Sequence, residues 1–250
     1  MRGPYPRVVI AGPASGAGKT TVAVGLMAAY AARGLEVQGF KVGPDYIDPT
    51  YHTAATGRVS RNLDSFMLPP EAVRECFWRA CRGADLAVIE GVMGLFDGKA
   101  GSGEGSTSEA ARLVASPVIL VVNCAKMGAS AGAIALGFAK YDEETDIKGF
   151  ILNNIGSERH EAMTRSAVEK ATGLPVLGCV KRNESVKVSE RHLGLLTQIE
   201  IGGNETYIDG LAELAEKHIN IEGVLDIARD VRPHSLERRA LKSRYAADKA

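Results

Sequence analysis

The sequence has little that would suit a secreted, membrane-bound or nucleic-acid-binding protein. Its four cysteines form no C-x-x-C pair and no zinc-ligand spacing, and no apolar leader pattern precedes the first strand-like run. We therefore expect a reduced, cytoplasmic protein. No apolar stretch approaches the roughly 20 residues that a membrane-spanning helix needs. The 30 acidic and 30 basic residues cancel, so charge gives no reason to expect a nucleic acid or a membrane surface as partner.

Aromatic residues are scarce at 6%, whereas glycine is plentiful, with 28 in 250 residues. Many glycines indicate tight turns, as expected where loops wrap phosphate groups. A chain of this length buries enough apolar surface for one large core without disulfides. We predict one domain over residues 1–230. Residues 231–250 have many Arg and Lys and few apolar residues, which predicts a basic tail or the start of a linker.

Short apolar runs alternate with amphipathic stretches along most of the chain. The runs predict strands at residues 7–11, 37–42, 86–89, 118–122, 147–152 and 176–180. The stretches predict helices at residues 19–33, 70–82, 107–115, 130–141, 161–172, 207–218 and 221–230. This alternation is typical of an α/β fold with a mostly parallel sheet and helices on both faces. Ligands of such sheets bind outside the carboxyl ends of the strands.

Residues 12–21 read G-P-A-S-G-A-G-K-T-T and join the first strand to the first helix, which is the order that a P-loop requires. The glycines let backbone N–H groups turn toward phosphates. Lys19 offers a positive charge to the β and γ oxygens, and the Thr20 hydroxyl can ligate magnesium. The predicted ATP site comprises Gly12, Ser15, Gly16, Ala17, Gly18, Lys19, Thr20 and Thr21.

The spacing departs from the strict G-x-x-x-x-G-K-[ST] pattern, because Pro13 holds the first glycine position and Gly12 lies one residue early. This irregular loop resembles a branch of P-loop proteins that includes dethiobiotin synthetase, the partitioning ATPases and the cobyrinic acid synthases. The resemblance implies a P-loop fold of the dethiobiotin synthetase type.

Acidic residues follow two of the predicted strands. Lys41, Asp45 and Asp48 come at and after the end of the second strand, where the ligand crevice is expected. Magnesium bound to phosphates takes one or two protein carboxylates, although both acids can also cap turns beside Pro44 and Pro49. Glu90 ends the next apolar run, and because an unpaired buried carboxylate is costly, it needs a cation or donors nearby.

Four blocks make the chain similar to one family, the cobyrinic acid a,c-diamide synthases, which are glutamine-dependent amidoligases acting on corrinoid or related tetrapyrrole carboxylates. The blocks are residues 12–21, residues 41–52 with their continuation at 62–64, residues 90–98, and residues 190–194. The resemblance runs from about residue 8 to residue 230. The second and third blocks are far more selective than any P-loop.

The resemblance implies the role of each matching residue. Lys19 and Thr20 would contact ATP and magnesium, and Asp45, Asp48 and Glu90 would surround the metal with Thr20. The implied substrate-binding residues are Tyr46, His52, Asn62, Leu63, Asp64 and Asp97, and the implied catalytic residues are Lys19, Lys41, Asp45 and Asp97. The pair Asn153-Asn154 ends a predicted strand, and Asn153 in particular would read the adenine edge, as an asparagine does in several relatives, with a strand-end turn as the equal alternative.

The implied reaction is ATP- and magnesium-dependent amidation through an acyl phosphate. In this family a glutaminase domain with a reactive cysteine normally follows, and no cysteine here has a nucleophile-elbow context. We therefore expect that domain to be absent from the chain, with ammonia supplied by a missing domain or a partner subunit. The choice among cobyrinic acid, hydrogenobyrinic acid and nickel-sirohydrochlorin stays open, as does the oligomeric state, for which a homodimer is one option.

Two other functions are compatible with the P-loop. A nucleotide switch of the partitioning type usually carries a signature lysine early in the loop, where this chain has Ala14. A carboxylation of the dethiobiotin type is disfavoured by the block at residues 43–52. One departure from the resemblance is Asn123, where many relatives are expected to carry an acid.

Overall fold

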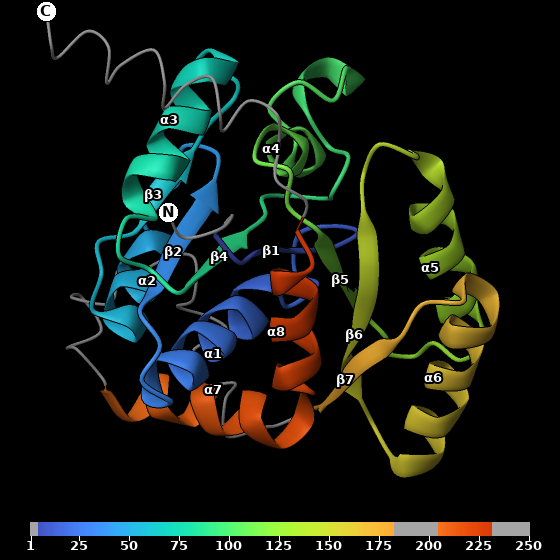
Figure 1. The fold of residues 1–250 in the computed structure, drawn as a ribbon. Coiled ribbons are helices and arrows are strands. Elements are labelled where there is room, and N and C mark those ends of the chain that lie inside the picture. The colour runs from blue at the N-terminus through green and yellow to red at the C-terminus, as the bar shows by residue number, and fades with distance from the viewer. Residues whose placement is uncertain (1–4, 183–204, 232–250) are drawn as a thin grey trace, which may run out of the picture.

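The structure is a computed structural model that describes residues 5–182 and 205–231. These residues form a seven-stranded parallel sheet with the strand order β3-β2-β4-β1-β5-β6-β7 (Figure 1). The strands are β1 Arg7–Ala11, β2 Val37–Val42, β3 Arg61–Leu63, β4 Leu86–Glu90, β5 Val118–Asn123, β6 Ile147–Ile155 and β7 Val176–Lys181. The helices are α1 Lys19–Ala32, α2 Asp48–Thr56, α3 Pro70–Ala80, α4 Thr107–Leu113, α5 Ser130–Tyr141, α6 Glu158–Thr172, α7 Glu205–His218 and α8 Ile221–Arg229, with a 3₁₀ turn, η1, at Lys99–Gly101.

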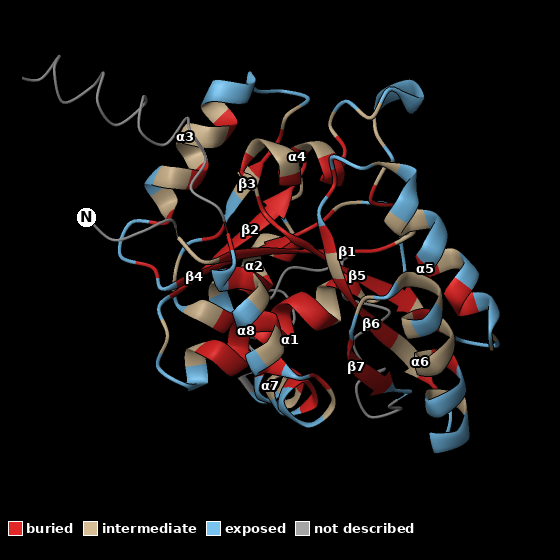
Figure 2. Ribbon diagram, turned by 45° about the vertical axis from the view of Figure 1, so that its right-hand side comes forward, coloured by how far each residue is buried: buried red, intermediate tan, exposed pale blue. Residues whose placement is uncertain are grey.

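Helices cover both faces of the sheet, and successive strand residues point to opposite faces. Val8 and Ile10 pack with α1, α7 and α8, whereas Val9 and Ala11 pack in the cluster that includes residues of α3, α4, α5 and α6. All strands except β3 are therefore made mostly of buried residues, which are red in Figure 2. This two-sided burial explains why their sequences are continuous apolar runs rather than alternating ones.

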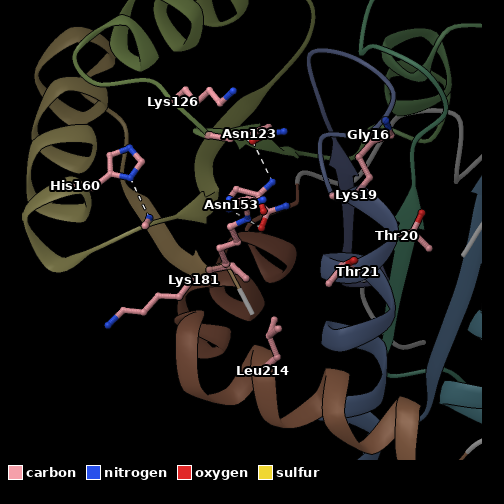
Figure 3. Close-up of a pocket in the computed structure, with 16 residues that line it drawn as sticks. Gly16, Lys19, Thr20, Thr21, Asn123, Lys126, Asn153, His160, Lys181 and Leu214 are labelled. Carbon is pink, nitrogen blue, oxygen red and sulfur yellow. Dashed lines mark hydrogen bonds between the residues drawn. The ribbon is translucent and has the colours of Figure 1, made fainter. Parts of the chain in front are cut away.

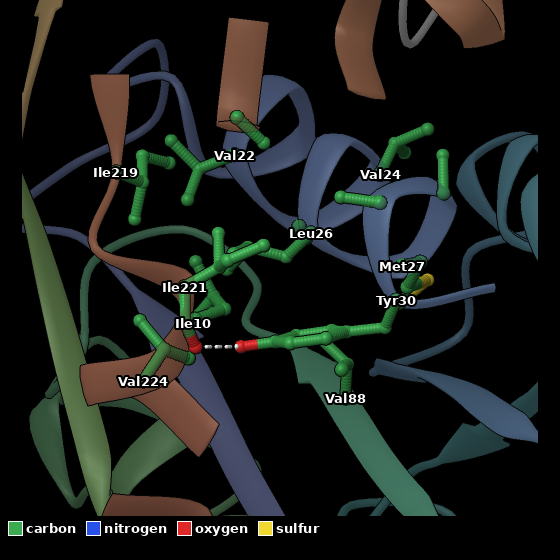
Figure 4. Packing of buried hydrophobic residues seen from close by; sticks show 14 of the residues in the cluster. Ile10, Val22, Val24, Leu26, Met27, Tyr30, Val88, Ile219, Ile221 and Val224 are labelled. Atoms are coloured by element: carbon green, nitrogen blue, oxygen red, sulfur yellow. Dashed lines mark hydrogen bonds between the residues drawn. The ribbon is translucent and has the colours of Figure 1, made fainter. Parts of the chain in front are cut away.

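Helix α1 lies at the centre of the first cluster and carries the P-loop at its N-terminus (Figure 4). Its Tyr30 hydroxyl donates a 2.7 Å hydrogen bond to the carbonyl of Ile221, at the start of α8. On the surface nearby, Arg33 forms ion pairs with Glu216 and Glu222. The C-terminal helices α7 and α8 thus pack against α1 and are tied to its C-terminal end.

The predicted α/β fold with a parallel sheet is confirmed, and each predicted strand is present. Two short elements were missed: α2, which begins with Asp48 and Pro49, and the three-residue β3. Neither has enough residues for a clear hydrophobic period, and tertiary contacts rather than local pattern define them. The structure describes no helix long and apolar enough to cross a membrane within residues 5–182 and 205–231.

Candidate active site

The P-loop joins β1 to α1 at the point where loops from neighbouring strands diverge, because β1 lies between β4 and β5. Such a crevice outside the carboxyl ends of the strands is where α/β sheets bind ligands. Gly16 and Gly18 have φ values of 75° and 99°, in the left-handed region that favours glycine. A Cβ at Gly12 would lie only 2.9 Å from the Ala17 Cβ. The loop therefore has the tight backbone that turns N–H groups toward an anion.

Lys19 lies buried at the first position of α1. Its Nζ donates to the carbonyls of Ala14 at 3.0 Å and Met93 at 2.7 Å. Within the described part of the chain no ion pair involves Lys19, and burial, followed by the charge of Lys41, lowers its pKa. A bound phosphate would stabilise the charged amine.

Asn153 supports the P-loop from β6. Its Nδ2 donates to the carbonyl of Ala17 at 3.1 Å, and its Oδ1 accepts from the backbone N–H of Asn154 at 2.8 Å. A Cβ at Gly18 would lie 2.1 Å from the same Nδ2 and position 18 has a φ of 99°, so this position favours glycine. The amide of Asn153 is thus engaged by the loop, and its contact with adenine stays a prediction.

A buried charge cluster lies at the ends of β2 and β4, which pair through Lys41 and Glu90. The Lys41 Nζ is 2.5 Å from Asp48 Oδ2, 2.9 Å from Glu90 Oε1 and 3.9 Å from Asp45 Oδ2. Burial opposes the charge of Lys41, but Glu90 and Asp48 outweigh burial and raise the pKa of its amine. Lys41 is therefore a fixed cation that stabilises the buried carboxylates.

Glu90 is fully buried, and both of its carboxylate oxygens are engaged. Oε1 accepts from the Thr20 hydroxyl at 2.5 Å as well as from Lys41, and Oε2 lies 2.7 Å from His52 Nε2. Burial alone would raise the pKa of the Glu90 carboxyl, but Lys41, His52 and Thr20 hold it well below its usual range. Glu90 thus connects the first turn of α1 to β2 and α2.

Asp48 has one oxygen free. Its Oδ1 is buried without a hydrogen-bond partner among the described residues, and burial, then Glu90, raises the pKa of Asp48 to about 6. A buried orphaned carboxylate oxygen fits a cation. The Thr20 oxygen keeps lone pairs while its hydroxyl donates to Glu90.

The predicted metal ligands Thr20, Asp48 and Glu90 are therefore brought together, with Asp45 beside them. Lys41 lies among the three carboxylates, and the described residues hold no group of three or more His, Cys, Asp or Glu side chains arranged for a metal. Magnesium bound to phosphates needs only one or two protein ligands. Thr20 and Asp48 fit that number, and the full predicted ligand set stays a prediction.

Two of the predicted substrate residues are exposed beside this cluster. Tyr46, after β2, is 76% exposed. Asp97, in the loop after β4, is also exposed, and its Oδ2 accepts from the backbone N–H of Gly94 at 2.9 Å. Both side chains are accessible to a ligand that approaches this edge of the sheet.

The other predicted substrate residues shape loops from the inside. Asn62 donates to the carbonyls of Gly43 and Asp45, and the buried Asp64 accepts from the backbone of Phe66 and Met67. His52 and Leu63 are 0% exposed, so neither can touch a ligand in this conformation. Their interpretation as substrate contacts stays untested, and the structure gives each a visible packing or hydrogen-bonding role.

A cavity of about 650 Å³ opens on the other side of the P-loop (Figure 3). It is lined by Gly16, Gly18, Lys19, Thr20, Thr21, Asn123, Ala125, Lys126, Asn153, Asn154, Gly156, His160, Val180, Lys181, Arg182 and Leu214. Among these lining residues are four lysines or arginines and no carboxylate. Such a lining suits an anionic ligand whose phosphates lie on the P-loop.

Sequence reasoning missed several of these lining residues. Asn123 was treated only as a departure from an expected acid, yet its Oδ1 accepts from Asn154 Nδ2 at 3.1 Å and from the Ala125 N–H at 3.0 Å. The Asn123 Nδ2 and Asn154 Oδ1 have no hydrogen-bond partner among the described residues. The usable signal was position, since Asn123 ends β5 and Asn154 lies one residue before the end of β6, both at the carboxyl edge of the sheet.

The cysteines do not form a reactive site. All four are free, and Cys81, Cys124 and Cys179 are buried. Burial raises the pKa of Cys124 to about 12 and that of Cys179 to about 11. Thiols held in the neutral form are poor nucleophiles. The block at residues 190–194 and, apart from Val231, the predicted tail at 231–250 lie outside the described residues.

The comparisons with known proteins agree with the resemblance seen in the sequence. The chain is 49% identical over 229 residues to the cobyrinate a,c-diamide synthase of Archaeoglobus fulgidus, which covers 91% of this chain and 50% of that protein. It is 49% identical over 228 residues to the hydrogenobyrinate a,c-diamide synthase of Streptomyces coelicolor, covering 90% of this chain and 46% of that protein. The chain thus spans about half the length of the curated relatives it matches.

Solved structures support the fold alone. A ParA family ATPase from Chlorobium tepidum superposes with a TM-score of 0.53 at 14% identity, covering 85% of this chain and 98% of that one. The septum site-determining protein MinD from Pyrococcus horikoshii, solved with Mg-ADP, gives a TM-score of 0.51 at 18% identity, covering 85% of this chain and 95% of that one.

A family model described as the CobQ/CobB/MinD/ParA nucleotide binding domain matches residues 8–196, so the chain belongs to this family.

Proposed function

We propose that the chain is the ATP-dependent synthetase part of an amidoligase that acts on tetrapyrrole side-chain carboxylates. The observation that carries the proposal is the hydrogen bond from Thr20, at the end of the P-loop, to Glu90. The Glu90 carboxylate also accepts a hydrogen bond from Lys41. This hydrogen bond connects the P-loop to the buried charge cluster at the ends of β2 and β4. The exposed side chains of Tyr46 and Asp97 lie beside that cluster. The cobyrinate and hydrogenobyrinate a,c-diamide synthases named above support the choice of reaction.

The proposed reaction overcomes the poor electrophilicity of a free carboxylate. A carboxylate oxygen attacks the γ-phosphorus of ATP, and ADP leaves. Ammonia then attacks the acyl carbon, loses a proton, and the tetrahedral adduct collapses to an amide and inorganic phosphate. Because phosphoryl transfer needs little covalent help from the protein, catalysis comes mostly from positioning and charge stabilisation.

The residues of this chain supply those two contributions. Lys19, held by two carbonyls, would bind the β and γ oxygens, and the P-loop N–H groups would bind the remaining phosphate oxygens. Thr20 and the free oxygen of Asp48 would hold magnesium. Magnesium, when bound, supplies charge neutralisation on the phosphates. Lys41 would keep Asp48 and Glu90 in place, while Tyr46 and Asp97 would contact the macrocycle.

The cavity beside the P-loop would take the nucleoside of ATP. Among residues 5–182 and 205–231, Asn123 Nδ2 has no acceptor and Asn154 Oδ1 has no donor, and the two side chains are joined by a hydrogen bond. Adenine presents an acceptor at N1 and a donor at N6, so this pair matches its edge. Asn153, which the sequence predicts to read the adenine edge, would then instead hold the loop that carries the phosphates.

Ammonia would come from glutamine, hydrolysed by a glutaminase domain or subunit. Which macrocycle is used, and whether two copies of the chain associate, are questions for experiment. The direct test incubates the chain with ATP, magnesium, ammonia and each macrocycle, and follows replacement of carboxylic acids by amides with mass spectrometry. We expect one or two amides on one of the macrocycles.

The main alternative is a nucleotide switch of the partitioning type, which shares the family and the fold. Ala14 stands where such switches usually carry a signature lysine, and this disfavours it. ATP hydrolysis that DNA or membranes stimulate, without any amide product from a tetrapyrrole, would reject the amidoligase proposal.

A further inference from the structure

His52 is a histidine that the reaction above does not use and that cannot reach a substrate, because its side chain is fully buried. It projects from α2 between two polar groups. Its Nε2 lies 2.7 Å from Glu90 Oε2, and its Nδ1 lies 3.2 Å from the Ser60 hydroxyl. Since Glu90 is an ionised acceptor, the Nε2 atom carries the proton and donates it to that carboxylate.

The backbone is shaped to bring the imidazole to this position. A Cβ at Gly39 would lie 2.9 Å from the His52 Cβ, so α2 can approach β2 this closely only over a glycine. Gly39 and Lys41 are two residues apart on β2 and share a face, and Lys41 pairs with Glu90 in the sheet. His52, seated over Gly39, is therefore directed at the oxygen of Glu90 that Lys41 does not use.

We propose that His52 is a positioning residue for the magnesium–ATP site: by holding Glu90 Oε2, it fixes Oε1 where that oxygen orients the Thr20 hydroxyl and Lys41. With one oxygen anchored, the carboxylate cannot rotate, so the Thr20 lone pairs stay directed toward the phosphates and Lys41 stays on Asp48. Partners of this kind behind a metal ligand typically change metal affinity 10–100-fold when they are removed. The inference rests on the proposed function, because it assumes that Thr20 meets a metal-bound nucleotide.

Two substitutions separate the two hydrogen bonds of the ring. Glutamine carries its amide nitrogen at about the position of Nε2, so His52→Gln keeps the donor to Glu90. Asparagine carries its side-chain amide at about the position of Nδ1, so His52→Asn keeps a polar group beside Ser60 and loses the donor to Glu90. The two variants are matched controls for each other, because each replaces the ring with a neutral amide.

The experiment measures the affinity of the full chain for ATP by calorimetry, once with magnesium and once with a chelator. For the wild type and His52→Gln we expect a similar gain in affinity from magnesium. For His52→Asn we expect that gain to fall about tenfold or more, with affinity in the chelator unchanged. A merely structural role would reduce binding under both conditions in both variants.

The outcomes are distinct. A full magnesium gain in His52→Asn, or an equal loss in both variants, overturns the inference while leaving the proposed function standing. A wild-type chain with no magnesium gain overturns both. Should His52→Asn fail to fold by circular dichroism, Gly39→Ala displaces the imidazole without removing it, and a magnesium gain of wild-type size in that variant overturns the inference.

Discussion

The two sides of the P-loop at the carboxyl edge of the sheet differ in how their charged side chains are balanced. Beyond β5 and β6, the cavity beside the P-loop is lined by amides and cations and by no carboxylate. Beside β2 and β4, carboxylates are buried and are balanced by Lys41 from within the chain. On the side of β5 and β6, the positive charges of the cavity lining would be balanced by an anionic ligand. On the side of β2 and β4, the carboxylates are already balanced by Lys41. The P-loop lies between the two sides. Its Lys19 and Thr20 both line the cavity, and they also contact the other half, Lys19 through Met93 and Thr20 through Glu90.

Under the proposed function, this difference means that nucleotide binding and carboxylate activation would be separable tasks in one crevice. The cationic side would hold ATP by charge. The acidic side would hold its own geometry and offer one free oxygen of Asp48 for a cation. Substitutions on the two sides are therefore expected to fail in different assays.

The largest effect is expected from Lys19→Ala, which removes the one cation common to both halves. We expect ATP-dependent turnover to fall by about 10²–10³-fold or more, the size seen when a group that stabilises transition-state charge is removed. Turnover is followed as phosphate release, with folding checked by circular dichroism. Turnover that survives in this variant would remove the P-loop assignment.

Glu90→Gln would test whether the acidic side is held together from within. The substitution removes the charge that faces Lys41 and His52 in a fully buried site. Removing one partner of a buried ion pair typically costs on the order of 3–5 kcal/mol of stability. Urea unfolding measures this cost. A stability unchanged from the wild type would show that Lys41 and Asp48 hold this cluster together without the charge of Glu90. The two sides of the P-loop would then not differ as described.

Asn123→Ala would test the cavity side alone. We expect loss of one hydrogen bond to adenine, about 1 kcal/mol or several-fold in ATP affinity, with less discrimination against GTP. Thermal stability should change little, because Asn123 lies at the end of β5 and is only half-buried. Calorimetry with ATP and GTP measures the ratio of the two affinities. A ratio unchanged from the wild type would mean that the base binds in another part of the cavity.

A further expected effect is a pH dependence of stability that arises from Asp48. Its folded-state pKa of about 6 lies above its ordinary value of 3.8, so the native state binds more protons between these values. The free energy of unfolding contributed by this group therefore falls as the pH rises from 3.8 through about 6. Asp48→Asn should lack that slope in urea unfolding across this range. The depressed pKa of Glu90 acts oppositely, since its contribution is lost as the pH falls.

The features that sequence reasoning predicted well are those with a local signal. The buried strands read as continuous apolar runs, and the P-loop is a contiguous segment between one strand and one helix, so both were located correctly. The resemblance blocks also pointed to Lys41, Asp48 and Glu90, which the structure brings into contact.

The side-chain contacts that sequence reasoning did not predict depend on tertiary packing, and they leave the substrate roles of these residues untested. His52 was interpreted as a substrate contact because it closes a substrate block, yet Gly39 lets α2 approach so closely that the imidazole is buried on Glu90. Asn62 and Asp64 turn inward to hold loops. Asn123 and Asn154 meet only because β5 and β6 are neighbours in the sheet. No local pattern contains these pairings.

The proposal that the P-loop and the buried charge cluster together activate a carboxylate is tested most directly by isotope transfer. A tetrapyrrole substrate carrying heavy oxygen in its side-chain carboxylates is incubated with the chain, ATP, magnesium and ammonia. An acyl phosphate hands one carboxylate oxygen to the phosphate that ammonia displaces. We predict one heavy oxygen in inorganic phosphate for each amide formed. Amide formation with unlabelled phosphate, or ATP hydrolysis without any amide, would contradict the account.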